Sequence, residues 1–349
     1  MNDVEFIQDL REEFMKIVSV KSNLPILKEL PDPICGDNEI IVELKSCGIC
    51  GSDIGNIFNI SSKPTEKIGH EISGKVLEIG KNVNLLKTGD RVIVNHHCSC
   101  NNCYFCMHGN ETMCDKFTEE IEPCGLAQKF VISSWILKNK GVFKIPEQVT
   151  FKDATLVEPF ACCLRAWKKV NVQKNDSVMI FGFGTIGIFH SIIAKKRGLH
   201  RIIIEHDKFR INFGKKEKIG EEFFSSHKDL VQKFDSKIDL CIIANPDVSC
   251  ISKAIKVVRK GGSILFFGEP KENSKVRVDM SEIYSKEITL TSSYSATNEE
   301  FISSIEFLVG NQDKFSKVVS HEFSFENALE AIELAKNGDN RIKVVVSNI

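Results

Sequence analysis

The sequence has no run of about twenty apolar residues and no N-terminus in which a charged start leads into an apolar stretch and a small-residue cleavage site. The first absence argues against a membrane-spanning helix, and the second against a secretory signal. An excess of charge is also missing, because 46 Lys and Arg face 47 Asp and Glu. A near-neutral chain has no general attraction for nucleic acid or an anionic membrane, so we expect neither as a partner.

Internal repeats and low-complexity segments are absent as well. The 349 residues exceed what one hydrophobic core usually serves, which predicts two domains. A hydrophobic content of 42% and a charged content of 27% are ordinary for a globular protein. Thirteen cysteines in a chain without a secretory signal indicate a reducing, cytoplasmic location and metal binding rather than disulfides.

Different hydrophobic patterns divide the chain. Residues 1–14 have the pattern of a short amphipathic helix or tail, and we expect an extension without a catalytic role. Residues 15–163 contain short alternating apolar runs broken by Gly, Pro, Asn and Asp, which predicts a β-rich domain. In residues 164–293 buried strands alternate with helices, which predicts a parallel sheet. Residues 294–349 return to a helix and a strand that we expect to fold back onto the first domain.

A glycine-rich turn follows one of the predicted parallel strands and opens a helix. Gly182, Gly184 and Gly187 have the G-x-G-x-x-G spacing, which permits a tight turn, close approach of a pyrophosphate and close helix packing. The helix offers unpaired N–H groups and the positive end of its dipole to phosphates. We predict that this loop, with Thr185 and Ile186 at the helix start, binds a dinucleotide.

An acidic residue ends the next predicted strand. Glu205 lies eighteen positions after Gly187, near the spacing of the carboxylate that binds a ribose 2′-hydroxyl. A carboxylate there would repel a 2′-phosphate, so the sequence favours NAD over NADP. Lys208 and Arg210 lie just beyond and keep NADP open, and Arg210 is an expected cofactor contact. The alternative is that Glu205 only caps the next turn.

Five cysteines are concentrated within residues 98–114. Four thiolates on one loop make a closed tetrahedral site, which suits a structural zinc and leaves no position for water. The expected ligands are Cys100, Cys103, Cys106 and Cys114. Cys98 is expected to be a bystander. A zinc ribbon that binds nucleic acid is the rival interpretation, but no basic cluster flanks these cysteines.

A sparser set of metal-ligating side chains is spread along the chain. One cysteine, one histidine and one carboxylate make a zinc site with a position open to water or substrate, and such a zinc polarises an oxygen beside the cofactor that carries the hydride. The residues of this set and its neighbours are Cys50, Ser52, Asp53, His70, Glu71 and Glu158.

Several motifs in this order resemble the zinc-containing medium-chain dehydrogenase/reductase family, and most closely its polyol (sorbitol-type) and threonine dehydrogenase branches. The matching stretches are "CGICGSD", "GHEISGKVLEIG", "GDRV", the four-cysteine lobe, "EPFACCLRA", "GFGTIG" and "IKVVV". The resemblance covers nearly the whole chain from Met15. It implies an α/β protein: a GroES-like β-rich catalytic domain and a Rossmann domain with a doubly wound parallel sheet, with the substrate cleft between them.

The resemblance also assigns roles to residues of the sparser set. It implies that Cys50, rather than Cys47, and His70 are ligands of the catalytic zinc. Ser52 matches the hydroxyl that takes the substrate proton. Asp53 resembles the partner that orients the zinc-bound histidine.

Two further assignments leave alternatives open. Glu71 and Glu158 compete for the remaining zinc position, and we expect exchange between them; for either, a hydrogen bond outside the ligand set is the alternative. Lys343 falls where a basic residue of the family reaches the cofactor pyrophosphate, although it could equally be a solvated lysine at a strand end.

The sequence departs from the family at the proton relay. Many relatives have a histidine where this chain has Gly55. The relay would then run through the cofactor ribose and water, or through another group. Threonine dehydrogenases have a histidine at the position of His97, which is therefore a hypothetical base or substrate-orienting group; an ordinary loop histidine is the alternative.

The resemblance implies an NAD-dependent alcohol dehydrogenase with two zinc ions per subunit, one catalytic and one structural. We expect its small-molecule substrate to be a secondary alcohol, in particular a polyol or sugar alcohol. The alternatives are an L-threonine 3-dehydrogenase and, from another class, a dinucleotide-binding protein without catalysis. Relatives assemble through their Rossmann domains, so a homo-oligomer is expected, with a tetramer favoured over a dimer.

Overall fold

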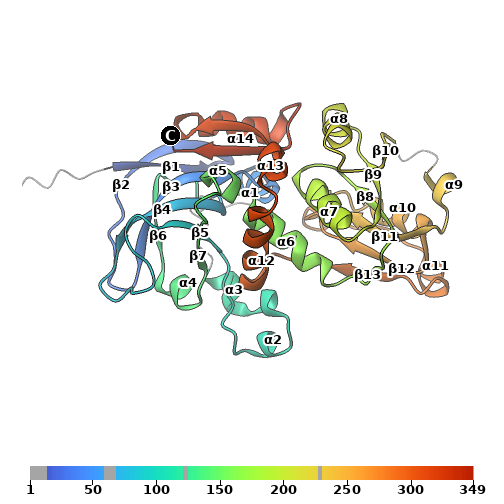
Figure 1. The fold of residues 1–349 in the computed structure, drawn as a ribbon, viewed down its shortest axis with the longest axis horizontal. Helices are drawn as coiled ribbons and strands as arrows, with labels where there is room; N and C mark the ends of the chain where they lie inside the picture. Colours follow the sequence, from blue (N-terminus) through green and yellow to red (C-terminus); the bar gives the residue numbers. More distant parts are fainter. Residues whose placement is uncertain (1–13, 59–67, 121–124, 227–229, 349) are drawn as a thin grey trace, which may run out of the picture.

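A computed structural model describes four parts of the chain, residues 14–58, 68–120, 125–226 and 230–348. Figure 1 shows a β-rich part and an α/β part, with helix α6 (Val157–Trp167) between them. The expected fold class is confirmed, since a β domain and a six-stranded parallel sheet are both present. Strand β1 begins at Phe14, one residue inside the predicted extension, and residues 1–13 lie outside the described residues.

The β-rich part is built on a seven-stranded sheet. The C-terminal strand β15 pairs antiparallel with β3 and parallel with β14, so the end of the chain completes the sheet of the first domain. The strands in spatial order are β14 (Val319–Ser324), β15 (Lys343–Ser347), β3 (Ile40–Gly48), β4 (Glu71–Ile79), β5 (Arg91–Val94) and β7 (Val142–Lys144), and β6 (Lys129–Ile132) pairs with β3.

A hairpin and several short helices surround this sheet. Strands β1 (Phe14–Lys21) and β2 (Leu24–Pro31) are joined by Ser22 and Asn23, which both have positive φ, as a two-residue turn between twisted strands requires. The helices are α1 (Gly51–Phe58), α2 (Tyr104–Met107), α3 (Asp115–Glu119), α4 (Ser134–Lys138), α5 (Phe151–Ala154) and α14 (Ala328–Asn337).

The α/β part contains a parallel six-stranded sheet. Its strand order reverses between β8 and β11, and in such sheets ligands bind at the carboxyl ends of the strands beside this reversal. The strands in spatial order are β10 (Glu222–Phe224), β9 (His200–Ile204), β8 (Ser177–Phe181), β11 (Ile238–Ile243), β12 (Val258–Phe266) and β13 (Thr289–Ser292).

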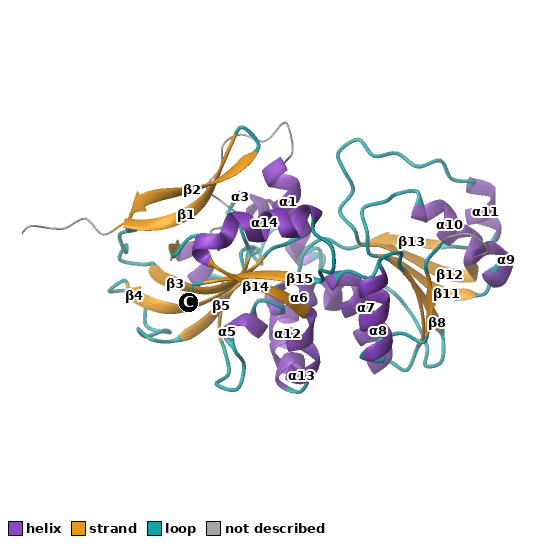
Figure 2. Cartoon of the chain, turned by 90° about the horizontal axis from the view of Figure 1, so that it is seen from above, coloured by secondary structure: helices purple, strands orange, loops and turns teal. Residues whose placement is uncertain are grey.

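Helices cover both faces of this sheet, as Figure 2 shows. Successive side chains of a strand point to opposite faces, and β8 follows this rule. Val178 and Ile180 belong to the cluster that contains Phe189 of α7, whereas Met179 belongs to the cluster that contains Ile251 of α10. The helices are α7 (Thr185–Lys196), α8 (Lys208–Lys216), α9 (Leu230–Phe234), α10 (Cys250–Val257) and α11 (Met280–Ser285).

An aromatic cluster joins the two parts. Phe160 of α6 meets Phe189 of α7 at a ring-centroid distance of 5.3 Å and Phe315 of α13 (Gln312–Phe315) at 4.9 Å. Phe307 of α12 (Asn298–Val309) lies 4.7 Å from Phe160. The domain boundary predicted at residue 163 falls inside the continuous helix α6.

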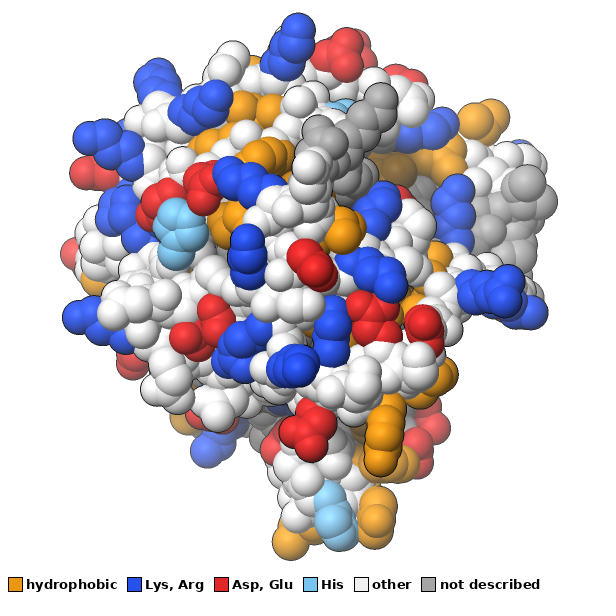
Figure 3. Space-filling model, turned by 90° about the vertical axis from the view of Figure 1, so that its right-hand side faces the viewer, with side chains coloured by type: hydrophobic (Ala, Val, Ile, Leu, Met, Phe, Trp, Pro, Cys, Tyr) orange, Lys and Arg blue, Asp and Glu red, His pale blue; other side chains and the backbone are white. Residues whose placement is uncertain are grey.

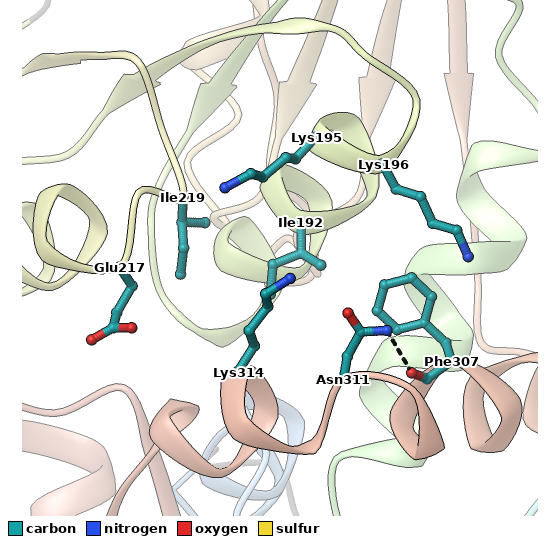
Figure 4. A pocket seen from close by; sticks show the side chains of 8 residues that line it. All are labelled: Ile192, Lys195, Lys196, Glu217, Ile219, Phe307, Asn311 and Lys314. Atoms are coloured by element: carbon teal, nitrogen blue, oxygen red, sulfur yellow. Dashed lines mark hydrogen bonds between the residues drawn. The ribbon is translucent and has the colours of Figure 1, made fainter.

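A hollow of about 260 Å³ opens beside this junction, between α7 and the α12–α13 segment (Figure 4). The ammonium of Lys196 lies 4.5 Å from the ring centroid of Phe307, and the Asn311 amide donates to the Phe307 carbonyl at 2.9 Å. Lys195 and Lys314 also line the hollow. None of its lining residues belongs to the predicted metal or cofactor sites.

The surface of the α/β part carries mixed charge. In Figure 3 positive and negative side chains are interspersed over this face, without a broad area of one sign. No helix in the described ranges is both long and apolar enough to cross a membrane.

Candidate active site

The sparser metal-ligating residues come from separate elements. Cys50 lies between β3 and α1, His70 immediately precedes β4, Glu71 begins β4, and Glu158 is in the first turn of α6. Glu71 is opposite Gly48 in the antiparallel pair of β3 and β4. A Cβ on Gly48 would overlap the Glu71 carboxylate, so the glycine makes room for that side chain.

Two sets of these side chains have the composition and spacing of a metal site. Cys50, His70 and Glu71 form the first set, and its ligand atoms lie within 4.8 Å of one another. The second set meets the same limit and consists of His70, His96 and Glu158. Each ligand expected for the catalytic zinc thus belongs to one of two sets, and the two sets share His70.

His96 is the residue that sequence reasoning missed. The available signal was the pair of adjacent histidines directly after β5. Adjacent side chains of an extended segment point to opposite sides, so one member of such a pair can face the metal ligands while the other faces away.

The expected contact between Asp53 and His70 is present. One carboxylate oxygen of Asp53 lies 3.2 Å from His70 Nδ1 and accepts from the Gly69 N–H at 3.1 Å, while the other accepts from the Cys50 N–H at 2.9 Å. Asp53 is only 3% exposed. This carboxylate therefore fixes the Cys50 loop and holds Nδ1 of His70, which leaves Nε2 for a metal.

Lys343 lies inside the metal cluster. It is 3% exposed, its ammonium forms an ion pair with Glu71, and it donates to the Ile49 carbonyl at 3.0 Å. Lys343 is therefore not a solvated lysine, and its contact with a cofactor pyrophosphate stays a prediction. The lysine is buried because β15 places it beside buried Glu71, which needs a cation nearby.

The cluster fits a divalent cation. The buried carboxylates of Asp53, Glu71 and Glu158 and the thiol of Cys50 surround His70, while Lys343 supplies one positive charge. Oε1 of Glu71 has no hydrogen-bond partner among the described residues. Sulfur, imidazole and carboxylate donors with an unpaired buried oxygen are the donor set that zinc takes in catalytic sites.

His97 points away from these ligands. Its ring stacks on Phe117 at 4.5 Å, its Nδ1 is 2.6 Å from the Phe117 carbonyl, and Tyr294 lies 6.3 Å away. Burial, together with the charge of His70, lowers the pKa of His97 to about 4. A ring that is neutral at neutral pH and holds its Nδ1 proton on a carbonyl is a weak base.

Tyr294 is a second residue that the sequence did not single out. It follows β13 and is 48% exposed. Burial of its phenol, and then the charge of Glu269, raises its pKa. Tyr294 therefore keeps its proton and forms, with His97 and Phe117, an aromatic group beside the metal cluster.

Ser52 and Gly55 lie on α1, next to Cys50. Ser52 is partly exposed, so its hydroxyl can be reached from solvent. A Cβ added to Gly55 would meet no atom of the described residues within 4 Å. The position where relatives have a relay histidine is thus open space here.

The four cysteine sulfurs of the lobe are spaced like the ligands of a tetrahedral metal site. The sulfur separations are 3.5 Å for Cys100–Cys114, 3.5 Å for Cys103–Cys106 and 3.9 Å for Cys100–Cys106. Zinc–sulfur bonds of about 2.3 Å in a tetrahedron put the sulfurs roughly 3.8 Å apart. The predicted structural zinc therefore fits this lobe, and Cys98 does not belong to the cluster.

A buried arginine ties the lobe to the rest of the molecule. Arg165 of α6 donates to the Thr112 hydroxyl at 3.3 Å and lies 3.7 Å from the Glu111 carboxylate, both in the lobe. Its other side lies 3.9 Å from Glu300 of α12. The lobe is thus held against the helices that join the two parts of the chain.

The glycine-rich loop has the strained turn that its sequence predicts. Gly182 has a φ of +96°, and a Cβ on Gly187 would overlap the Gly182 carbonyl, so both positions require glycine. Gly184 caps α7, whose first residues are Thr185 and Ile186. The N-terminus of this helix is therefore available to a pyrophosphate.

Glu205 is buried at the end of β9. One of its carboxylate oxygens accepts from the Phe183 N–H at 2.8 Å, and the other accepts from the N–H groups of His206 and Asp207 at 2.7 and 2.9 Å. The Arg210 guanidinium lies 3.6 Å from Glu205 and donates to the Arg341 carbonyl at 3.0 Å. Glu205 thus orders this turn, which is the role that the sequence left open as the alternative, and its contact with a ribose stays a prediction.

The short segment Ile342–Lys343 connects the metal cluster to the dinucleotide loop. Thr185 of the loop donates to the Ile342 carbonyl at 3.1 Å, and the next residue, Lys343, pairs with Glu71. On α6, Cys162 donates to Glu158 at 3.2 Å. A metal that polarises an oxygen and a dinucleotide that carries a hydride are together the parts that a dehydrogenase needs.

Comparison with known proteins supports this class. Residues 36–147 match the family described as "Alcohol dehydrogenase GroES-like domain". Sorbitol dehydrogenase of Bacillus subtilis is 25% identical over 92% of this chain and 93% of its own length, and human sorbitol dehydrogenase is 28% identical over 89% and 90%. L-galactonate-5-dehydrogenase of Escherichia coli is 27% identical over 88% and 91%.

Solved structures share the fold along nearly the whole chain. An alcohol dehydrogenase of Escherichia coli CFT073 complexed with NADH superimposes with a TM-score of 0.85 at 25% identity, covering 96% of this chain and 99% of that one. Galactitol-1-phosphate dehydrogenase of Escherichia coli has the same fold, with a TM-score of 0.80 at 23% identity and coverage of 95% and 100%. Over nearly its whole length the chain is homologous to zinc-containing medium-chain dehydrogenases of the alcohol dehydrogenase type, and residues 36–147 carry their GroES-like domain.

Proposed function

We propose that this protein is an NAD-dependent dehydrogenase that oxidises a secondary alcohol group of a polyol or sugar alcohol. The observation that carries the proposal is the short segment Ile342–Lys343, which contacts the dinucleotide loop through one residue and the metal cluster through the next. Relatives named for sorbitol and L-galactonate support a polyhydroxylated substrate.

Some residues of the open metal centre would bind the metal, and others orient its ligands. When bound at Cys50, His70 and a glutamate, zinc supplies a Lewis acid for the substrate oxygen. Asp53 keeps His70 in the tautomer that exposes Nε2. A second zinc in the four-cysteine lobe supplies stability only.

Ser52 is the proposed first acceptor of the substrate hydroxyl proton. It is partly exposed on α1, directly beside Cys50 and the Asp53 turn. Because Gly55 offers no side chain, the ribose of a bound cofactor and water would have to carry the proton onward. His97 contributes to the wall of the substrate space together with Phe117 and Tyr294. If His97→Asn shifted the pH–rate profile, His97 would be the base instead.

NAD is the proposed cofactor because Glu205 directly follows β9, the place from which a carboxylate of a dinucleotide-binding fold binds the ribose 2′-hydroxyl and would repel a 2′-phosphate. When bound at the glycine-rich loop, NAD would supply the hydride acceptor. The nearby Arg210 makes NADP the control that must be run beside NAD.

We also propose that the chain forms a homo-oligomer, with a tetramer favoured over a dimer. Strand β13 is the last strand of the parallel sheet, so one of its edges is unpaired within the chain. Near it, Leu290 is 49% exposed and Tyr284 is 86% exposed. An open strand edge with exposed apolar side chains is a surface on which a second copy can pair.

The test is NADH formation by the zinc-loaded protein with polyols, sugar alcohols, simple secondary alcohols and L-threonine, with NADP in parallel. Turnover of one or more polyols with NAD supports the proposal. Turnover of L-threonine alone would replace it by an L-threonine 3-dehydrogenase. No turnover by protein that binds NAD but only one zinc would indicate a dinucleotide-binding protein without catalysis.

A further inference from the structure

His96 is a buried histidine in contact with the metal ligands. It lies two residues after β5, is 6% exposed, and its ring centroid is 4.7 Å from that of His70. Its Nδ1 has no hydrogen-bond partner among the described residues. A buried nitrogen without a partner is destabilising, because it has lost its hydrogen bonds to water and gained none from the protein.

No neighbouring side chain among the described residues supplies the hydrogen bond that His96 Nδ1 lacks. On one side His97 is 4.0 Å away and is already engaged with the Phe117 carbonyl. On the other side are His70, whose Nδ1 is held by Asp53, and Glu158, which accepts from the Cys162 thiol. His96 therefore faces the two side chains that have donor atoms left for a cation.

The spacing of these donors suits a metal. One ligand atom each from His70, His96 and Glu158 lies within 4.8 Å of the others. Ligand atoms that lie about 2.0–2.2 Å from a tetrahedral zinc are roughly 3.4 Å from one another. Small side-chain rotations would therefore bring these three atoms to the distances that a bound zinc requires.

Glu71, the carboxylate of the other set, has a competing partner. It is 1% exposed and pairs with the buried ammonium of Lys343. Binding of Glu71 to a metal would place the cation beside the buried ammonium of Lys343, so that two positive charges share one buried carboxylate, which is costly. Glu158 gives up only the hydrogen bond from Cys162.

We propose that His96 is a ligand of the open metal centre. With Glu158 and the shared His70 it forms a second set of metal-binding side chains, next to the set that contains Cys50 and Glu71. The proposal rests on the proposed zinc-dependent function, because it concerns the same metal. It assigns the centre two imidazole ligands rather than one.

The test uses a hybrid protein with zinc in the four-cysteine lobe and Co²⁺ in the open centre, so that cobalt X-ray absorption reports that centre alone. We expect two imidazoles on cobalt in the unchanged protein and one in His96→Gln. We also expect a loss of cobalt affinity in chelator competition that exceeds the roughly 10- to 100-fold typical of a residue outside the ligand set. One imidazole in the unchanged protein would overturn the proposal.

Two further variants separate ligation from folding. His97→Gln is the matched control, because it removes the adjacent buried histidine and should leave two imidazoles. His96→Cys should place a second sulfur on the cobalt and intensify the sulfur-to-cobalt charge-transfer absorption. An unchanged absorption in a folded His96→Cys protein would show that this side chain does not reach the metal.

The outcome also separates this proposal from the proposed function. A protein that oxidises polyols and carries cobalt with one imidazole keeps its function and loses the His96 assignment. A protein whose open centre takes up no cobalt and no zinc contradicts both.

Discussion

The two metal clusters of this chain differ in how they are built. The ligands of the lobe lie within residues 100–114 and are all sulfurs, carried by a loop and short helices at the surface. The ligands of the open centre span residues 50–158, come from separate elements and are of three chemical kinds. A closed structural site can thus be encoded locally, whereas a site with a free position is assembled by the tertiary fold.

The difference extends to what holds each cluster together. The lobe has backbone hydrogen bonds of its own and the anchor Arg165, but most of its side chains are exposed and it has little core, so its shape depends on the metal. The open centre is held by the Asp53 hydrogen bonds and the Lys343–Glu71 pair. We therefore expect metal loss to unfold the lobe and to leave the open centre nearly in place.

The largest expected effect is on catalysis. Cys50→Ser should lower NADH formation on the order of 10³-fold or more, because the Lewis acid is worth several kcal/mol in the transition state. The zinc content should fall by about one per chain while the melting temperature changes little. Loss of the fold in this variant would contradict the distinction between the two clusters.

The reciprocal change is Cys103→Ser in the lobe. It should cost on the order of several kcal/mol of local stability, because zinc binding and lobe folding are one process. Limited proteolysis should then cut within residues 98–114, and the remaining zinc should stay at the open centre. A protease-resistant lobe with a full complement of zinc would be the contrary result.

A smaller effect is expected from Asp53→Asn. The amide keeps the shape but loses the charge that fixes His70 Nδ1–H, and such changes outside the ligand set typically cost about 10- to 100-fold in metal affinity or activity. Chelator competition and kcat are the measurements. The matched change Asp115→Asn, at the start of α3 in the lobe region, should leave both unchanged.

The smallest effect concerns a histidine outside both clusters. His190 of α7 is fully buried, its Nδ1 accepts from Trp167 at 3.0 Å, and burial lowers its pKa to about 3. In the unfolded chain the pKa of this histidine is near 6.5, so between about pH 3 and 6.5 the unfolded state binds more protons than the folded state. The free energy of unfolding therefore falls as pH drops below about 6.5, by up to about 1.4 kcal/mol per pH unit.

His190→Gln should therefore flatten the acid side of the stability curve relative to the unchanged protein. Denaturant unfolding of the metal-loaded proteins at several pH values between 4 and 7 measures the difference, with about 1.4 kcal/mol per unit as its upper limit. Parallel curves for both proteins would mean that acid sensitivity comes from the metal ligands alone.

Local patterns were enough to predict much of the fold. The apolar run of β8, the glycines after it and Glu205 at the end of β9 lie within one strand–helix–strand unit, where sequence distance limits spatial distance. The four lobe cysteines are a similar case, because a short loop brings them together whatever the rest of the chain does.

Other features depended on contacts between distant segments. The sequence left open whether Lys343 is solvated, and pairing of β15 with β3 buries it beside Glu71. His96 and His97 are neighbours in sequence, and only their packing decides that His96 faces the ligands while His97 stacks on Phe117. Tyr294 comes to the same region from the end of the parallel sheet.

The sequence by itself determined the two-domain architecture, the lobe and the dinucleotide loop, because each is specified by residues close together along the chain. The tertiary structure decided which charged side chains surround the metal, since strands β3, β4 and β15 and helix α6 must pack before these groups meet. Burial then sets their partners: a carboxylate removed from water takes the nearest cation, and for Glu71 that cation is Lys343.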